Sequence, residues 1–263
     1  MILDRIVADK LLEVEASKRQ IPLHAIRELA ESAPGPRDFA GALCGEYVAL
    51  IAEIKRASPS SGEIRREADP LQVARVYAAN GAAAISVLTD WLYFQGGPGC
   101  LQAARAGSSV PLLRKDFIVD EYQVYESRAL EADAVLLIAR ILDDARLSSF
   151  LMLAASLRMP ALVEVHDEGE LERALTGGAR IIGVNNRNLD DFSIDLATTD
   201  ELVPRIPSDR IAVSESGHHS RADVERAARA GAKAVLVGQA LMQSGNIGAK
   251  INELTGVARI EAR

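Results

Sequence analysis

The chain has 263 residues, of which 48% are hydrophobic and 25% are charged, the ordinary composition of a folded globular protein. Its net charge of −7 argues against a general nucleic-acid binder or a membrane-surface binder, although it is compatible with a small anionic ligand. Two widely spaced cysteines without a CxxC motif, and four histidines without an HExxH motif, predict neither a disulfide framework nor a metal site.

The N-terminal residues predict helices and a cytoplasmic protein. The first ten residues mix acids and bases and contain no signal-peptide core, and no apolar run approaches the roughly 18 residues that span a bilayer. Apolar and charged positions follow helical spacing over residues 2–19, and a second helix is expected over residues 24–32. A Pro-Gly-Pro sequence at 34–36 ends that helix, so we expect residues 1–46 to form an N-terminal extension.

From residue 47 onward, short apolar runs alternate with helical stretches. Mostly apolar runs indicate parallel strands buried on both faces, and eight such strands close a (β/α)8 barrel. An open doubly wound sheet is the alternative, but no GxGxxG sequence follows the first run. We therefore expect one α/β domain over residues 1–263, a (β/α)8 TIM barrel with the N-terminal helical extension. The expected strands are 48–52, 84–88, 110–113, 134–138, 161–165, 181–184, 211–213 and 234–237, and the expected helices include 70–80, 121–131, 144–156, 168–176, 220–230 and 239–253.

The end of the first strand carries charges that suit a site. Glu53 and Lys55 are two residues apart, so their side chains lie on the same face of a strand. An unpaired buried charge is costly, so an acid and a base at a strand end are expected to face each other or a charged ligand. A Ser-Pro-Ser-Ser-Gly turn at 58–62 follows and adds hydroxyl groups, among them that of Ser58. This combination indicates a site.

Two charged residues at the ends of later strands have competing interpretations. Side chains alternate along a strand, so only one of Arg114 and Lys115 is expected to point into the barrel mouth. Lys115 is then either a functional group or a solvated surface charge. Glu164 lies in the apolar sequence Leu-Val-Glu-Val, where a carboxylate is paired or has a raised pKa that suits a general acid or base. The alternative for Glu164 is a structural ion pair.

The remaining strand ends supply polar groups and glycines, at the face where barrels of this kind place their chemistry. A Ser-Gly after the seventh strand and a Gly after the eighth let backbone N–H groups approach a phosphate; the alternative is a pair of tight turns. His166, His218 and His219 are interpreted as loop residues without a catalytic role. The polar or glycine positions at these strand ends are Thr89, Asp90, Asn185, Asn186, Arg187, Ser214, Glu215, Ser216, Gly217 and Gly238.

Taken together, these segments closely resemble the indole-3-glycerol-phosphate synthase family, barrel enzymes of the tryptophan pathway. The resemblance runs nearly end to end. It implies ring closure with decarboxylation and dehydration of 1-(2-carboxyphenylamino)-1-deoxyribulose 5-phosphate to indole-3-glycerol phosphate, a carboxy-lyase reaction without a cofactor. The segments that carry it are Arg-Asp-Phe at 37–39, Glu-Ile-Lys at 53–55 with Ser-Pro-Ser at 58–60, Thr-Asp at 89–90 with Phe-Gln-Gly at 94–96, Leu-Arg-Lys-Asp-Phe at 113–117, Leu-Val-Glu-Val-His at 162–166, Gly-Val-Asn-Asn-Arg-Asn-Leu at 183–189 and Ser-Glu-Ser-Gly at 214–217.

The same resemblance implies roles for individual residues. It makes Lys115 the general acid that protonates the ketone oxygen during ring closure, and Glu164 a base and acid in the later steps. Lys55 is implied to hold an anionic end of the substrate and forms, with Glu53, a rival pair for the dehydration. Arg187 is implied to lie near the substrate carboxylate. Residues implied to orient or stabilise intermediates are Asn185, Glu215 and Ser216, and those implied to bind the substrate or its phosphate are Ser58, Gly217 and Gly238.

Three positions depart from the family pattern, and none carries assigned chemistry. Ser61 stands where Lys is usual, His218 where an aliphatic residue is usual, and Gln239 where a smaller or acidic residue is common. We expect a small phosphorylated substrate, a monomer or weak homo-oligomer, and no nucleic-acid or membrane partner. Two other functions compete with this one. An isomerase barrel for a phosphoribosyl substrate predicts a Cys or Asp acid–base pair at the strand ends, and a catalytically silent binding barrel predicts loss of Lys115 or Glu164.

Overall fold

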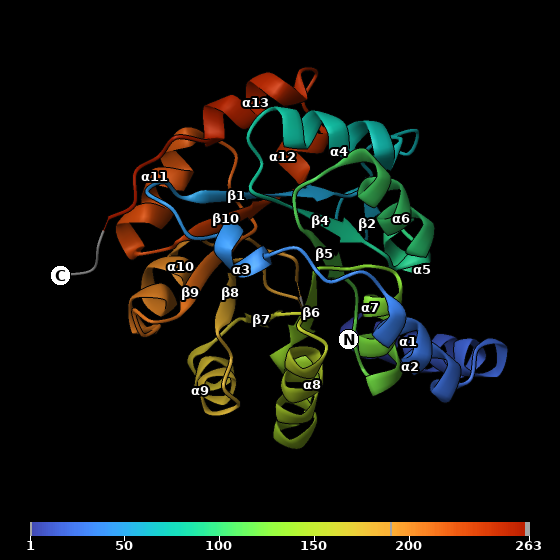
Figure 1. The fold of residues 1–263 in the computed structure, drawn as a ribbon. Coiled ribbons are helices and arrows are strands. Elements are labelled where there is room, and N and C mark those ends of the chain that lie inside the picture. The colour runs from blue at the N-terminus through green and yellow to red at the C-terminus, as the bar shows by residue number, and fades with distance from the viewer. Residues whose placement is uncertain (1, 190, 261–263) are drawn as a thin grey trace.

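A closed barrel of parallel strands forms the centre of the computed structural model, which describes residues 2–189 and 191–260 (Figure 1). Around the barrel, neighbouring strands follow the order β1, β10, β9, β8, β7, β6, β5, β4 and back to β1, and every pair is parallel. The predicted (β/α)8 TIM barrel is therefore confirmed. The barrel strands are β1 (Ala49–Ile54), β4 (Ala84–Leu88), β5 (Leu112–Lys115), β6 (Ala134–Ile138), β7 (Ala161–Val165), β8 (Ile181–Asn185), β9 (Ile211–Glu215) and β10 (Ala234–Val237).

Helices surround this barrel, and a short antiparallel hairpin of β2 (Ala57–Ser58) and β3 (Gly62–Glu63) follows β1. Among the described residues, no helix is long and apolar enough to cross a membrane. The α-helices are α1 (Ile2–Gln20), α2 (Leu23–Ser32), α3 (Phe39–Ala42), α4 (Pro70–Ala79), α5 (Trp91–Phe94), α6 (Pro98–Gly107), α7 (Glu121–Ala129), α8 (Asp144–Ser156), α9 (Glu168–Thr176), α10 (Ala197–Leu202), α11 (Arg221–Ala230), α12 (Gln239–Met242) and α13 (Ile247–Leu254). Two 3-10 helices are η1 (Ala139–Ile141) and η2 (Val203–Arg205).

One helix and four strand ends differ from the prediction in an informative way. The prediction of a single helix over 239–253 is wrong, because the helix ends after α12 and a second one, α13, begins further along the chain. The side chain of Asn246 caps the start of α13 by accepting a hydrogen bond from the N–H of Ala249. Several strands also run further than their apolar runs, so that Glu53, Lys115 and Glu215 belong to strands rather than to the turns after them. In the barrel mouth Glu53 pairs with Lys55, and Lys115 pairs with Glu215. Because these charges are paired, the strands can continue through polar residues.

The barrel interior is closed at one end by apolar side chains. Phe39 and Leu43, from α3 and the residue after it, are fully buried against inward-facing strand residues such as Ile51 and Leu113. Figure 1 shows α3 in front of this end of the barrel. A second, larger core fills the space between the strands and the outer helices. A ligand is therefore excluded from the α3 end, and the opposite end, where the strand arrows point, is the one available for a site.

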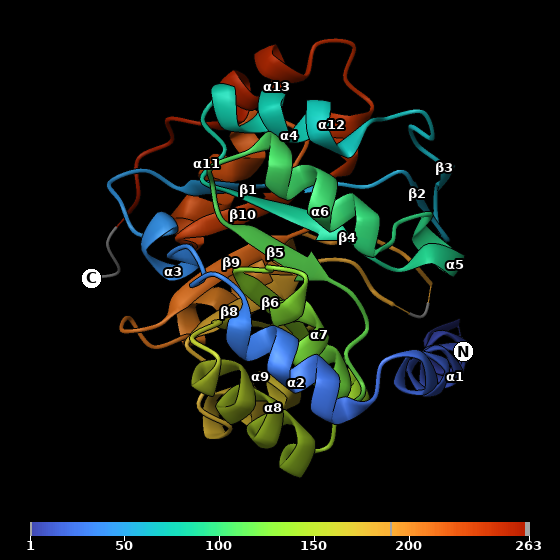
Figure 2. The same cartoon turned by 45° about the vertical axis from the view of Figure 1, so that its right-hand side comes forward.

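Helix α1 lies at that opposite end, below α5 in the view of Figure 2. Its Lys10 is 2% exposed, and the Nζ atom is 2.9 Å from Asp90 Oδ2 and 3.0 Å from Asp116 Oδ1. Burial alone would raise the pKa of Asp116, but Arg114 and Lys10 outweigh it and lower that pKa to about 2. The helix is thus fastened to the residue that directly follows Lys115.

We expect Lys10→Met to lower the free energy of unfolding by about 3–5 kcal/mol, because it leaves Asp90 and Asp116 buried without this cation. Urea unfolding at pH 7 measures the effect. Lys18→Met on the same helix is the matched control, because Lys18 is 29% exposed and pairs with Asp120 near solvent. Its expected loss is about 0–1 kcal/mol. Equal losses in the two variants would show that the buried cluster does not fasten α1.

Candidate active site

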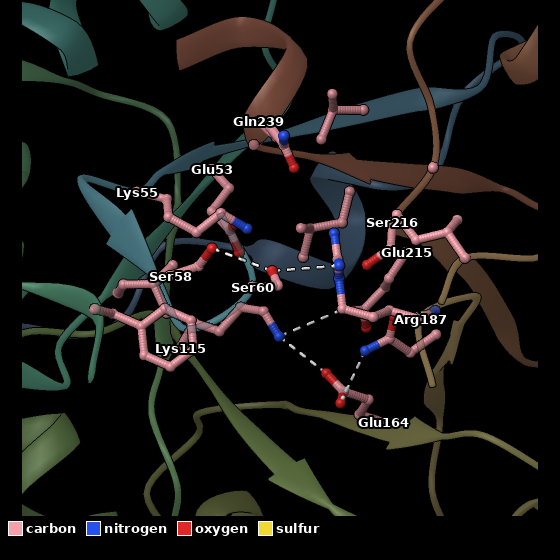
Figure 3. Close-up of a pocket in the computed structure, with 18 of the residues that line it drawn as sticks. Glu53, Lys55, Ser58, Ser60, Lys115, Glu164, Arg187, Glu215, Ser216 and Gln239 are labelled. Carbon is pink, nitrogen blue, oxygen red and sulfur yellow. Dashed lines mark hydrogen bonds and ion pairs between the residues drawn. The ribbon is translucent and has the colours of Figure 1, made fainter. Parts of the chain in front are cut away.

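A cavity lies where the C-terminal ends of the barrel strands meet (Figure 3). Because the strands are parallel, their ends gather residues that are far apart in the sequence. The structure brings all of the predicted site residues to the wall of this one cavity: Glu53, Lys55, Ser58, Lys115, Glu164, Asn185, Arg187, Glu215, Ser216, Gly217 and Gly238. Apolar side chains complete the lining, among them Leu88, Phe94, Phe117, Leu136, Ile138, Phe192, Ile194 and Leu236.

Lys115 lies between two carboxylates at the end of β5. Its Nζ atom is 2.9 Å from Glu164 Oε2 and 3.4 Å from Glu215 Oε2, as the dashed lines in Figure 3 indicate for its closest contacts. Burial opposes the charge on this amine, but Glu164, Glu215 and Glu53 outweigh burial and raise the pKa of Lys115 above its ordinary value. Lys115 is therefore an ammonium group that faces the cavity and can donate a proton.

Arg114, the preceding residue, points away from the cavity. Its guanidinium contacts Asp116 at 3.1 Å and Glu126 of α7 at 2.7 Å, on the helix side of β5. The prediction that only one residue of this pair enters the mouth is confirmed. The pairing also explains how two adjacent cations are accommodated in one strand, since each has its own carboxylate partners.

Glu164 is held at both carboxylate oxygens inside the barrel mouth. Lys115 donates to Oε2 at 2.9 Å, and Asn185 Nδ2 donates to Oε1 at 3.1 Å from the neighbouring strand β8. Burial would raise the pKa of Glu164, but Lys115 and His166 outweigh burial and lower it below its ordinary value. Glu164 is consequently an anion that can accept a proton, and its ion pair forms part of the cavity wall.

Glu215 has the opposite electrostatic character. It is 1% exposed, and neither of its carboxylate oxygens has a hydrogen-bond partner among the described residues. Burial, opposed by Lys115 and reinforced by the anions Glu164 and Glu53, raises the pKa of Glu215 to about 7. Two carboxyl groups with well-separated pKa values thus share one ammonium group, an arrangement typical of acid–base catalysis.

Glu53 and Lys55 pair with each other, as their spacing predicts, with Lys55 Nζ 2.8 Å from Glu53 Oε1. Gly238 at the end of β10 makes room for this carboxylate, because a Cβ atom there would overlap Glu53 Oε1. Gly217 is required for a different reason, since its φ of +84° is unfavourable for other residues. Ser216 before it also has a positive φ, +66°. The two glycines therefore shape neighbouring parts of the wall.

The β2–β3 hairpin lies at the edge of the cavity and contacts Arg187 in the loop after β8 (Figure 3). Arg187 Nη1 donates to Ser60 Oγ at 3.3 Å, and the Ser60 and Ser58 hydroxyls are also 3.3 Å apart. Two of the three positions that depart from the family pattern touch each other here, since Ser61 Oγ donates to Gln239 Oε1 at 3.5 Å. A neutral contact therefore joins the hairpin to the residue after Gly238.

Three aromatic residues after the second barrel strand, Trp91, Tyr93 and Phe94, have different surroundings. Phe94 lines the cavity with Phe117, and their ring centroids are 6.0 Å apart. Trp91 is 70% exposed and lies outside the cavity, while the Tyr93 hydroxyl bonds to Asp9 of α1. Only Phe94 of these three is placed to cover a ligand.

Two loop histidines are more deeply placed than the sequence suggests. His218 Nε2 is 2.9 Å from Ser214 Oγ, and burial lowers the pKa of His218 to about 4, so its ring is neutral at pH 7. His166 Nε2 is 3.4 Å from Glu164 Oε1. The signal for His166 was present, because it follows Glu164 by two residues, the same spacing that places Glu53 and Lys55 on one face.

Comparison with known proteins identifies the family. A model of the family described as "Indole-3-glycerol phosphate synthase" matches residues 3–254. The chain belongs to the indole-3-glycerol phosphate synthase family. Relatives named indole-3-glycerol phosphate synthase include one from Dehalococcoides mccartyi strain CBDB1, 52% identical over 97% of this chain and 100% of that protein. Another, from Variovorax paradoxus strain S110, is 51% identical over 92% of this chain and 94% of its own length. The predicted family is confirmed.

Solved structures with low sequence identity to this member of the indole-3-glycerol phosphate synthase family resemble it in fold, and they support the fold alone. Thiamine phosphate pyrophosphorylase from Pyrococcus furiosus aligns with a TM-score of 0.57 at 15% identity, covering 79% of this chain and 93% of that one. A mandelate oxidase mutant aligns with a TM-score of 0.58 at 16% identity, covering 92% of this chain and 91% of that one.

Proposed function

We propose that this cavity converts 1-(2-carboxyphenylamino)-1-deoxyribulose 5-phosphate to indole-3-glycerol phosphate, CO2 and water, as a carboxy-lyase in tryptophan biosynthesis. Membership of the family supports the overall function. The observation that supports the chemistry is the Lys115 ammonium between an anionic Glu164 and a Glu215 that titrates near pH 7. The isomerase alternative predicted a Cys or Asp acid–base pair at the strand ends. This cavity has Glu and Lys there, and Asp116, which also lines it, is paired with Lys10 and Arg114.

In the first step, the ring carbon that bears the carboxylate attacks the ketone carbon. The ketone oxygen gains negative charge as the C–C bond forms, so it needs a proton donor in place. Lys115 supplies that proton. The same step leaves a positive charge on the ring, and the carboxylates of Glu53 and Glu215 stabilise it electrostatically. Lys115 is thus the residue whose interaction with the substrate strengthens most in the transition state.

The later steps restore aromaticity. Loss of CO2 returns the electrons of the C–C bond to the cationic ring, and loss of the new hydroxyl group as water, with a proton from carbon, completes the indole. Glu164 acts as base and acid in these steps, consistent with its lowered pKa. Glu53 and Lys55, 2.8 Å apart, are the rival pair for the dehydration.

Other residues bind and orient the substrate. Lys55 and Arg187 attract its anionic groups, and the hairpin hydroxyl of Ser58 contributes a hydrogen bond at the same edge. Backbone N–H groups at Gly217 and Gly238 hold the phosphate. Asn185 and Ser216 orient the intermediates, and Phe94 with Phe117 covers the aromatic ring. We place this enzyme in the cytoplasm, as a monomer or weak homo-oligomer with one barrel domain over residues 1–263 and an extension over 1–46.

Gly183→Ala is expected to lower kcat by about 100-fold, because displacing a catalytic group by about 1 Å has effects of that size. A Cβ atom at Gly183 on β8 would overlap Glu215 Oε1 and push this carboxylate away from Lys115. Gly99→Ala on α6 is the matched control, since a Cβ atom there meets nothing within 4 Å. Steady-state kinetics of both variants check the prediction, and an unchanged kcat for Gly183→Ala would show that Glu215 needs no fixed position.

The increase of indole fluorescence with the carboxyphenylamino substrate tests the function directly. Wild-type protein is expected to give a steady increase that the isomerase and the silent-barrel alternatives do not predict. Adding a cofactor or metal ion is expected to leave the rate unchanged. Absence of any increase with folded wild-type protein would refute the proposed function.

A further inference from the structure

His166 lies behind Glu164, where the reacting groups do not reach it. It follows β7 directly, its side chain is 8% exposed, and it is not among the described residues that line the cavity. Its Nε2 atom is 3.4 Å from Glu164 Oε1 and has no hydrogen-bond partner among the described residues. The imidazole therefore contacts Glu164 Oε1 without itself lining the cavity.

Glu170, in the first turn of α9, fixes the orientation of this imidazole. Its Oε2 atom is 3.0 Å from His166 Nδ1 and also accepts from the His166 backbone N–H at 2.8 Å. The Glu170 backbone N–H donates in turn to Asp167 Oδ1, the N-cap of the helix. Because a carboxylate can only accept, the Nδ1 atom of His166 carries a proton.

Because Nδ1 carries a proton, the protonation of Nε2 decides whether Glu164 Oε1 faces a lone pair or an N–H group. A neutral ring protonated on Nδ1 would turn an Nε2 lone pair toward Glu164 Oε1, which is repulsive, whereas an imidazolium ring presents an N–H. The charged groups that face His166 are Glu164 on β7 and Glu170 on α9, while Lys115 and Asn185 reach Glu164 from β5 and β8. Burial lowers the pKa of His166, but the two carboxylates outweigh burial and raise it to about 9.

We propose that His166, held by Glu170, is a positioning residue that fixes the carboxylate of Glu164 from behind and keeps its Oε2 directed at Lys115. Asn185 and His166 hold Oε1, and Lys115 holds Oε2, so that Glu164 has one orientation during the reaction. This inference rests on the proposed function, because Glu164 needs a fixed orientation only if it transfers protons.

Glu170→Gln tests the inference through the pH profile of kcat/KM. The amide can still accept both hydrogen bonds from His166, but it lacks the charge that raises the pKa of His166. The wild-type profile is expected to fall as pH rises through about 9, where the imidazolium loses its proton. In Glu170→Gln this fall is expected about 1–3 pH units lower, with little change in KM below it. If Glu170 had a merely structural role, the variant would have lower activity, but the pH at which kcat/KM falls (the alkaline limb of the profile) would not change.

His166→Asn is expected to lower kcat by about 10- to 100-fold, the usual effect of losing a contact to a charged group, and to remove the limb near pH 9. His24→Asn, the same change at an exposed histidine of α2, is the control and is expected to match wild type. An unmoved alkaline limb in both His166→Asn and Glu170→Gln would overturn the inference. Inactive wild-type protein would instead refute the proposed function, so the two failures are distinguishable.

Discussion

We expect Lys115→Met to lower kcat by about 1,000-fold and to change the dissociation constant of the substrate by less than about tenfold, since general acids contribute about 10²–10⁴. The reason is that Lys115 meets the ketone oxygen mainly when that oxygen gains charge, so its contribution appears in the transition state. Methionine keeps most of the apolar stem but has no proton to donate. Single-turnover fluorescence and substrate titration separate the two quantities.

Lys115→Arg is the companion variant, because it keeps a cation between Glu164 and Glu215 but cannot release a proton at working pH. It is expected to bind substrate and to remain nearly as slow as Lys115→Met. If both variants lost binding in proportion to turnover, Lys115 would hold an anionic group of the substrate and would not be the general acid. Circular dichroism confirms that each variant is folded.

The second large effect is expected for Glu164→Gln, with kcat lowered about 10²–10⁴-fold. The amide keeps a similar shape, but its single oxygen can accept from only one of Asn185 and Lys115, and it cannot take up a proton. Because Glu164 is proposed to act after ring closure, CO2 release is expected to precede the indole signal in a single turnover. Without this anion beside it, Glu215 is also expected to have a lower pKa than the value of about 7 in the wild type.

Glu168→Gln is the matched control for that charge change, since Glu168 lies near Glu164 in sequence but is 60% exposed on α9. It is expected to behave as wild type. If CO2 release and indole formation slowed together in Glu164→Gln, this residue would act at ring closure or decarboxylation. An unchanged kcat would leave Glu53 and Lys55 as the pair that carries the later chemistry.

The barrel and most of its mouth could be predicted because the relevant signals are local. Apolar runs mark the strands, and parallel strands must bring their ends to one face, so Glu53, Lys115 and Glu164 had to meet. Alternation along β5 correctly predicted that only one of Arg114 and Lys115 faces the cavity, and the structure shows that it is Lys115. The ends of β1, β5, β8 and β9 were predicted too short, since their apolar runs stop at a polar or charged residue although the backbone ladder continues.

Contacts between distant segments could not be predicted from such patterns. Lys10 looks like one of many charges on an amphipathic helix, and nothing local indicates that it is buried against Asp90 and Asp116. His166 was interpreted as a loop residue because the strand pattern ends before it, although its spacing from Glu164 was a signal; its contact with Glu170, four residues further on, is seen only in the folded structure. These contacts depend on how α1 and α9 pack, which is decided by the whole molecule.

Parallel measurement of CO2 and indole-3-glycerol phosphate from one reaction of the wild-type protein tests the central claim most directly. The proposed chemistry requires that each substrate molecule loses its carboxyl group and closes its ring in the same active site. We therefore expect one CO2 for each indole-3-glycerol phosphate throughout the reaction, with no added cofactor. Indole formation without an equal amount of CO2, or CO2 without indole, would contradict this account.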